Sequence, residues 1–326
     1  MRPKILLTDK EVHIGSITDE LEAVAELVRC ESNDEETLVA AAADVDLIIV
    51  SCFTKIPAAV IENAGKLKAV LKYGVGVDNI DLNAATRKGI LVVNCPEYGS
   101  NTIAEHAFAL MIGLAKKLVR IDKLTRKKLW LWPEPELMGT ELQEKTIGLI
   151  GFGKIGRAMA RMTIGFGMHA VVHDPYVPAE QIKACNADSV SLDELLAVSD
   201  VVSIHCVLTP ETEKLIGATE LERMKPSAFL IDVSRGAIID DTALIRALQE
   251  NRIAGAGLDV FAEEPLKPEN PLLKMENVIL TPHLAWYTRE AFDRLAQETL
   301  QRVLEIFDGK IPHNIKNPEV IETREA

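Results

Sequence analysis

The sequence lacks the cysteine pattern of a disulfide framework or of a zinc site. It contains five cysteines, an odd number, and no two of them form a C-x-x-C pair. Such usage is typical of proteins from a reducing compartment. We therefore expect a cytoplasmic protein that binds no metal. The cysteines are Cys30, Cys52, Cys95, Cys185 and Cys206.

Positive charge and long apolar runs are also scarce. The 36 lysines and arginines are outnumbered by 49 acidic residues, and the net charge is −13. A surface of this sign repels phosphate backbones, which argues against nucleic acid as a ligand. The N-terminal apolar run is interrupted by Asp9 and Lys10, too early for a signal peptide or a membrane span. We expect no association with a membrane.

The chain does contain enough apolar residues for a sizeable core. Of its 326 residues, 48% are hydrophobic and 26% are charged, as in a globular protein of about two domains. Strand-sized apolar runs alternate with helical stretches at 20–29 and 56–64. This alternation predicts a parallel sheet covered by helices on both faces, formed by residues 1 to about 98. The predicted strands are 4–8, 46–51, 67–74 and 90–94.

A helical stretch without proline follows at 101–128, and then a loop at 129–142 that holds Trp130 and Trp132. The long helix either crosses between domains, forms a subunit interface, or is one long packed helix. A second alternation of strands and helices then begins at Thr146 and predicts a second parallel sheet. An amphipathic helix at 288–309 follows it. The further predicted strands are 169–175, 200–206, 228–234, 254–260 and 277–283.

The second alternation opens with a glycine pattern typical of dinucleotide-binding turns. A strand-like run leads into G-x-G-x-x-G at Gly151, Gly153 and Gly156, and a helical stretch follows. These glycines permit a tight turn, close approach of a pyrophosphate and close helix–strand packing, while the helix N-terminus faces the phosphates. Asp174, at the spacing expected for a ribose-binding carboxylate, predicts NAD rather than NADP. The alternative for Asp174 is a turn residue before Pro175.

Three residues suited to oxo-acid chemistry follow predicted strands of this second half. Arg235 can bind a carboxylate through its planar guanidinium, and His283 can exchange a proton near neutral pH. Glu264 can hold the histidine ring and favour its charged form. Ligands bind at the carboxyl ends of parallel strands, so we expect the three side chains to meet there. Each alone has a structural alternative, as a surface arginine, a loop charge and a packed histidine.

Motifs along most of the chain resemble the D-isomer-specific 2-hydroxyacid dehydrogenases, a family that includes phosphoglycerate dehydrogenases, hydroxypyruvate and glyoxylate reductases and the C-terminal binding proteins. They occur in the family's order. The motifs are KYGVGVDNIDL at 72–82, ATRKGILVVN at 85–94, NTIAEHAFALMI at 101–112, GFGKIGRAMA at 151–160, HCVLTPET at 205–212, DVSRGAIID at 232–240, GLDVFAEEPL at 257–266 and TPHLAWYT at 281–288.

This resemblance implies an α/β fold of two doubly wound parallel-sheet domains. A Rossmann NAD-binding domain at 100–286 would be inserted into a flavodoxin-like substrate domain at 1–99 and 287–326, with the catalytic cleft between them and a hinge at the chain crossings. A homodimer built on the 101–128 helix would be expected.

The resemblance also implies roles for individual residues. His283 would be the proton donor, Glu264 its partner, and Arg235 the residue that orients a 2-oxo acid. NADH would deliver a hydride to C2 of that acid. The substrate would further meet Lys72, Tyr73, Gly74, Val75, Gly76 and Trp286. The cofactor would meet Gly151, Phe152, Gly153, Lys154, Ile155, Gly156, Asp174, Thr102, Cys206, Val207, Thr212, Val233, Asp259 and Ala285.

The natural substrate stays open between 3-phosphoglycerate, glycerate or hydroxypyruvate, glyoxylate and similar acids. Phosphoglycerate dehydrogenases tend to carry arginines where this chain has Ser51 and Lys72, which argues against a phosphorylated substrate. Two other functions are possible. One is a dinucleotide-sensing protein like the C-terminal binding proteins, against which the lack of a long partner-binding tail weighs. The other is a phosphite-type dehydrogenase, while the glutamate at 264 argues against formate.

Overall fold

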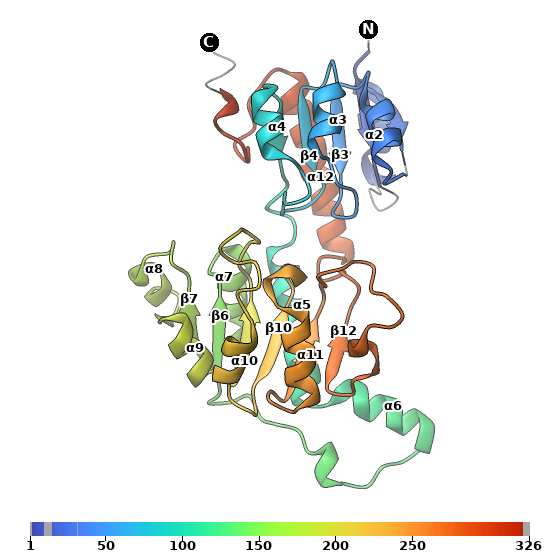
Figure 1. Cartoon of the computed structure of the whole chain (residues 1–326). Helices are drawn as coiled ribbons and strands as arrows, with labels where there is room; N and C mark the ends of the chain where they lie inside the picture. The colour runs from blue at the N-terminus through green and yellow to red at the C-terminus, as the bar shows by residue number, and fades with distance from the viewer. Residues whose placement is uncertain (1, 10–14, 31, 322–326) are drawn as a thin grey trace. The chain divides into compact units, whose positions relative to one another are not determined.

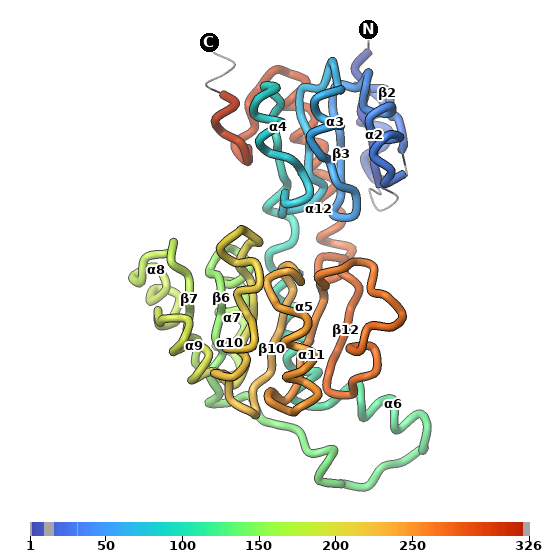
Figure 2. Tube along the Cα trace, in the orientation of Figure 1, coloured from blue at the N-terminus to red at the C-terminus, as the bar shows by residue number. Residues whose placement is uncertain are grey.

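The computed structural model describes residues 2–9, 15–30 and 32–321, which form two units (Figures 1 and 2). The first unit comprises Met1–Gly99 with Thr288–Ala326, and the second comprises Ser100–Tyr287. The second boundary falls one residue later than the predicted one between 286 and 287. Within the described residues, no helix combines the length and hydropathy that crossing a membrane requires.

The first unit contains a parallel sheet with strand order β2-β1-β3-β4-β5, the order of flavodoxin-like folds. The central strands are buried on both faces, which explains their continuous apolar sequences. The strands are β1 (Lys4–Leu7), β2 (Glu26–Arg29), β3 (Leu47–Val50), β4 (Ala69–Lys72) and β5 (Leu91–Val93). The helices are α1 (Thr18–Val24), α2 (Glu35–Ala42), α3 (Ala58–Asn63), α4 (Leu82–Arg87) and α12 (Arg289–Phe307). A 3-10 turn, η1 (Gly15–Ile17), directly precedes α1.

The predicted helix at 20–29 is wrong in its second half. Helix α1 ends at Val24, and residues 26–29 form the edge strand β2, which pairs in register with β1. Leu27 and Val28 lie three and four residues after Val24 and so continue the apolar spacing of a helix, while a run this short is also compatible with a strand. Pairing with β1 gives the backbone N–H and C=O groups of this segment hydrogen-bond partners, and the segment therefore forms a strand.

The second unit contains a seven-stranded parallel sheet with order β12-β11-β10-β9-β6-β7-β8. The prediction of an α/β fold with two parallel sheets is therefore confirmed. The strands are β6 (Thr146–Ile150), β7 (His169–His173), β8 (Ala187–Ser189), β9 (Val201–Ile204), β10 (Phe229–Asp232), β11 (Gly255–Leu258) and β12 (Val278–Leu280). The helices are α5 (Ser100–Ala115), α6 (Leu118–Lys128), α7 (Lys154–Ile164), α8 (Ala179–Lys183), α9 (Leu192–Val198), α10 (Ala218–Arg223) and α11 (Asp241–Gln249), and the 3-10 turns are η2 (Pro135–Leu137), η3 (Gly236–Ile238) and η4 (Pro271–Lys274).

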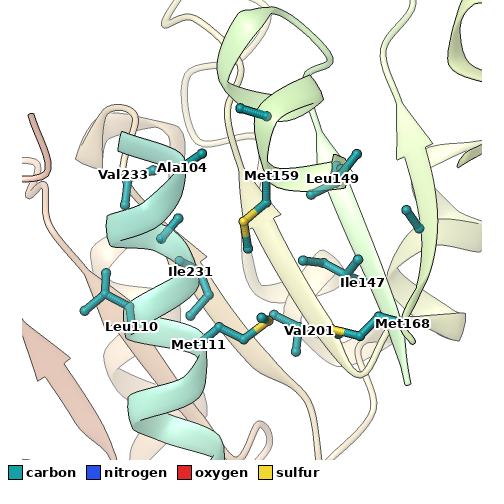
Figure 3. Packing of buried hydrophobic residues seen from close by; sticks show 14 of the residues in the cluster. Ala104, Leu110, Met111, Ile147, Leu149, Met159, Met168, Val201, Ile231 and Val233 are labelled. Atoms are coloured by element: carbon teal, nitrogen blue, oxygen red, sulfur yellow. The ribbon is translucent and has the colours of Figure 1, made fainter. Parts of the chain in front are cut away.

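Strand order reverses between β6 and β9, and this switch point is where open α/β sheets bind ligands. Helix α5 covers one face of the sheet beside it, and its apolar side chains pack with those of β6, β9 and β10 (Figure 3). Strand β11 presents glycines to this helix. A Cβ built on Gly257 would lie 3.0 Å from the Cβ of Leu110, so the missing side chain lets α5 lie close to the strand.

The long helix predicted at 101–128 is wrong, because it is interrupted after Ala115. Lys117 has a left-handed backbone (φ 52°), and α6 begins after it in a new direction. Helix α6 has no buried residue and extends away from the sheet of its own unit, followed by the predicted loop (Figure 1). Neither proline nor glycine occurs at residues 115–117, where the helix is interrupted. The interruption is visible only because the residues after it no longer form a side that faces the core.

Candidate active site

The glycine-rich turn has the shape that the sequence predicts. It joins β6 to α7, with Gly151 at φ 92° and Gly153 at the N-cap of α7. A Cβ on Gly151 would lie 2.5 Å from the backbone nitrogen of Cys206, and one on Gly156 would overlap the carbonyl oxygen of Gly151. A Cβ on Gly153 would meet nothing within 4 Å. Two glycines are therefore needed for packing, and the third leaves open space before the helix N-terminus for a pyrophosphate.

Asp174 follows β7 and lies beside this turn. Its Oδ2 accepts a hydrogen bond from the amide of Phe152 at 2.7 Å, and its Oδ1 accepts one from the amide of Tyr176 at 2.9 Å. Each carboxylate oxygen has a second lone pair, so the residue can also accept from ribose hydroxyls. Asp174 therefore orders the glycine-rich turn, and its role in binding the ribose of a dinucleotide stays a prediction.

The other predicted cofactor residues of the second unit come from several elements. Thr102 is buried on α5, and Val233 is buried directly after β10. The segment after β9 is shaped by Thr212, whose hydroxyl donates to the carbonyl of Val207 at 2.7 Å and accepts from the amide of Thr209 at 2.8 Å. Burial raises the pKa of the Cys206 thiol to about 12, so this side chain is neutral. Lys154 and Ile155 open α7.

His283 and Glu264 form a hydrogen-bonded pair. The Nδ1 of His283 lies 2.7 Å from Oε2 of Glu264, and the other oxygen of that carboxylate accepts from the amide of Phe261 at 2.9 Å. Burial by itself raises the pKa of Glu264, but the hydrogen bond and charge of His283, the Phe261 amide and the Arg235 guanidinium outweigh it, and the pKa lies below its usual value. An ionised carboxylate requires a proton on Nδ1, which leaves Nε2 to exchange a proton.

Arg235 lies close enough to Glu264 to help lower the pKa of that carboxyl. Its Nη1 donates to the carbonyl of Ser234 at 2.8 Å, and the side chain is half-buried. A Cβ on Gly236 would overlap the backbone of Phe261, because the turn after β10 presses against the segment that leads to Glu264. The fold thus brings together the three predicted catalytic residues of the second unit.

Asp259, a predicted cofactor residue, makes several hydrogen bonds within the second unit. It is fully buried after β11, and its carboxylate accepts from the Thr281 hydroxyl at 2.6 Å and from the amides of Leu284 and Ala285 at 2.9 and 2.8 Å. These donors all belong to the segment that carries His283. In this structure the carboxylate therefore orders that segment, and a contact of Asp259 with the cofactor stays a prediction. Trp286, later in the segment, packs against the core beside α5.

Lys72, a predicted substrate residue, lies at the end of β4 in the first unit. Its side chain is buried, and its Nζ donates to the carbonyl of Ser51 at 2.7 Å and to Oδ1 of Asn79 at 2.6 Å. The ammonium thus holds neighbouring loops of its own unit. Tyr73 is buried, Gly74 has φ 144°, and the carbonyl of Val75 accepts from Asn94 at 2.6 Å, while Gly76 continues the same loop.

Asp232 is a buried acid that the motif DVSRG contains but whose side chain the sequence did not single out. Its Oδ1 accepts from the amide and the hydroxyl of Ser234 at 2.8 and 2.6 Å, while its Oδ2 has no partner among the described residues. Burial raises the pKa of Asp232 to about 7, against those hydrogen bonds. Only its position at the end of an apolar strand could have indicated burial.

Comparison with known proteins is consistent with this geometry. Residues 108–285 match the model of the D-isomer specific 2-hydroxyacid dehydrogenase NAD-binding domain. The glyoxylate reductase of Korarchaeum cryptofilum is 38% identical over 327 residues, 99% of this chain and 98% of the relative. A D-3-phosphoglycerate dehydrogenase of Archaeoglobus fulgidus is 40% identical over 289 residues, 88% of this chain and 54% of the relative. The D-lactate dehydrogenase of Aquifex aeolicus, solved with NAD and lactic acid, has a TM-score of 0.89 at 31% identity, covering 96% of this chain and 99% of that one.

Replacement of Asp232 by asparagine should stabilise the protein most at alkaline pH. A buried carboxyl with a raised pKa contributes most below its ordinary pKa of 3.8, and the contribution is lost as the pH rises through about 7. Asparagine keeps an acceptor for Ser234 and carries no charge. We expect Asp232→Asn to raise the free energy of unfolding more at about pH 8 than at about pH 5, measured by urea denaturation. Asp188, whose side chain is 74% exposed, provides the control Asp188→Asn. An equal change at both pH values would contradict the account.

Proposed function

Since the chain belongs to the D-isomer-specific 2-hydroxyacid dehydrogenase family, we propose that it reduces a small 2-oxo acid with NADH and that His283 is the proton donor. Membership makes it an oxidoreductase of CH–OH donors with an NAD(P) cofactor. The observation that carries the proposal is the 2.7 Å hydrogen bond between Nδ1 of His283 and the ionised Glu264.

The residues of the second unit fit this chemistry. The open space at Gly153 and the carboxylate of Asp174 suit a dinucleotide, which supplies the hydride when bound. The guanidinium of Arg235 binds the substrate carboxylate. Nε2 of His283 gives its proton to the C2 oxygen as the carbonyl becomes a hydroxyl, and Glu264 stabilises the imidazolium that precedes the transfer. The reverse reaction returns the proton to the same nitrogen.

In the same proposal, the second unit binds the cofactor and the first unit contributes to binding of the substrate. Of the predicted loop at 74–77, the amide of Gly74 already donates to the carbonyl of Lys72 at 2.9 Å, so the amides of residues 75–77 are the ones that serve the substrate. Trp286 limits the size of the substrate. Because the ammonium of Lys72 is already bonded to Ser51 and Asn79, we favour an unphosphorylated acid such as glyoxylate or hydroxypyruvate over phosphohydroxypyruvate. All five cysteines are free, which supports the cytoplasmic location.

His283→Ala should lower turnover by roughly a hundredfold to ten-thousandfold, the usual contribution of a general acid. In Glu264→Gln the imidazolium loses its countercharge, so the pH above which reduction falls should move downward, by about one unit. The assay is NADH absorbance with glyoxylate, hydroxypyruvate and phosphohydroxypyruvate over a pH series. Glu263, which pairs with Lys267 at the surface, gives the control Glu263→Gln. Full turnover in His283→Ala would disprove the assignment, and an unmoved pH profile in Glu264→Gln would disprove the pairing.

NADH should be preferred to NADPH because Asp174 repels a ribose 2′-phosphate. We expect a preference in kcat/KM of roughly tenfold to a hundredfold, the worth of a hydrogen bond to a charged group. Asp174→Asn removes the charge, while its single carbonyl oxygen keeps an acceptor for one of the two amides, that of Phe152 or that of Tyr176, so the preference should shrink toward one. The ratio of kcat/KM for the two cofactors is measured in wild type and variant. A ratio unaffected by the substitution would assign Asp174 to the turn alone.

A homodimer is also part of the proposal. The segment after α6 exposes Leu129, Trp130, Trp132 and Met138, each with more than two-thirds of its surface accessible. Contiguous apolar side chains of this kind mark interfaces. Helix α6 has no buried residue, so it provides no core against which these side chains could pack. The double variant Trp130→Ser, Trp132→Ser should shift the molecular mass in light scattering from dimer toward monomer. Tyr176→Ser, at another exposed aromatic residue, is the control. A monomeric wild type would refute this part.

A further inference from the structure

We propose that His106 on α5 is a positioning residue for the proton donor, acting through the hydroxyl of Thr281. The inference rests on the proposed function, because it assigns a consequence to the orientation of His283. His106 bonds to Thr281, and Thr281 bonds to the carboxylate of Asp259. Asp259 in turn accepts from the backbone amides of His283 and of the two residues that follow it. All of these residues lie in the second unit.

The direction of each hydrogen bond in this chain can be derived. Nε2 of His106 lies 2.9 Å from Oγ1 of Thr281, and the same hydroxyl lies 2.6 Å from Oδ1 of Asp259. A hydroxyl has a single proton, and a carboxylate that receives two amide hydrogens and this hydroxyl is an acceptor. Thr281 therefore donates to Asp259 and accepts from His106. It follows that Nε2 of His106 carries a proton.

Asp259 depends on such donors because it is fully buried. A buried carboxylate is costly unless hydrogen bonds or a cation compensate its charge. A second carboxyl, that of Asp232, lies close enough for the two charges to repel. Nε2 of His106 lies 3.6 Å from Oδ1 of Asp259, so the N–H of this imidazole is close to the carboxylate as well as bonded to Thr281. Its removal would leave Thr281 without this donor and weaken the compensation of Asp259.

The consequence for His283 follows from where the bonds of Asp259 lie. The backbone carbonyl of Asp259 accepts from the amide of His283 at 2.7 Å. The carboxylate of Asp259 accepts from the amides of Leu284 and Ala285. His283 has a left-handed backbone (φ 57°), a conformation that is strained for a residue with a side chain and persists only when its neighbours impose it. Thr281 and Asp259 are among those neighbours.

Helix α5 provides a rigid base for this arrangement. Its close approach to β11 across Gly257, and to β12, where a Cβ on Gly113 would lie 2.9 Å from Cδ1 of Ile279, fixes its register on the sheet. His106 is thus held by packing that does not involve the catalytic residues. A displacement of His283 of about 1 Å is enough to lower turnover by roughly a hundredfold. The side chain of His106 therefore belongs with the determinants of rate, although it touches no reacting atom.

The test replaces each end of the chain with a matched pair of variants. His106→Phe removes the donor, while His106→Gln restores an N–H; Thr281→Val removes the hydroxyl at constant size, while Thr281→Ser keeps it. We expect His106→Phe and Thr281→Val to lower kcat about tenfold to a hundredfold with the Kd for NADH unchanged, and the Gln and Ser variants to stay within about threefold of wild type. The double variant His106→Phe, Thr281→Val should have the kcat of the slower single variant, because both substitutions interrupt the same chain of hydrogen bonds. His169, exposed at the start of β7, supplies the control His169→Phe.

The possible failures are distinguishable. Wild-type kcat in His106→Phe, additive losses in the double variant, or a loss in His106→Gln equal to that in His106→Phe would each overturn the inference. If His106→Phe does not fold, Thr281→Val carries the test with the same criteria. His283→Ala is assayed alongside: its full activity would overturn the proposed function itself, whereas its inactivity with normal His106→Phe would overturn the inference alone.

Discussion

The hydrogen bond from His283 to Glu264 is the interaction on which the proposed chemistry depends. It fixes the proton on Nδ1 and frees Nε2, and it places an ionised carboxylate beside a ring that must be charged to act as an acid. Glu264 is itself held by the amide of Phe261, and the nearby turn of Arg235 and Gly236 presses on that segment. The pair is therefore a product of how consecutive strand ends pack.

The parallel sheet explains why these groups meet. Strands β10, β11 and β12 are neighbours, and Arg235, Asp259 and His283 follow them in that order. Their carboxyl ends lie on the same edge as that of β6, where the glycine-rich turn begins. The same edge concentrates acids: Asp232 and Asp259 are fully buried there, and hydrogen bonds from Ser234, Thr281 and backbone amides compensate them. Stability and chemistry thus depend on the same short segments.

The sequence predicted most of the arrangement that local rules govern. The spacing of Gly151, Gly153 and Gly156 is set by one turn. Arg235, Glu264 and His283 were proposed from their chemistry and from their places after predicted strands. Neither set required knowledge of how the chain packs. The failures involve tertiary contacts. The strand at 26–29 is decided by pairing with β1, and the break at Lys117 by the end of the core. The bond from Lys72 to the carbonyl of Ser51 and the bonds of Asp259 and His106 to Thr281 join residues more than twenty positions apart, which periodicity cannot show.

The most direct test of the central claim is to follow the hydride. NADH carrying deuterium at both C4 positions is incubated with the protein and glyoxylate or hydroxypyruvate, and the product acid is analysed by mass spectrometry. The account predicts a 2-hydroxy acid with a single deuterium on C2, formed by the wild type and lost in His283→Ala. A product without deuterium, or no product from any small 2-oxo acid while NADH still binds, would contradict it.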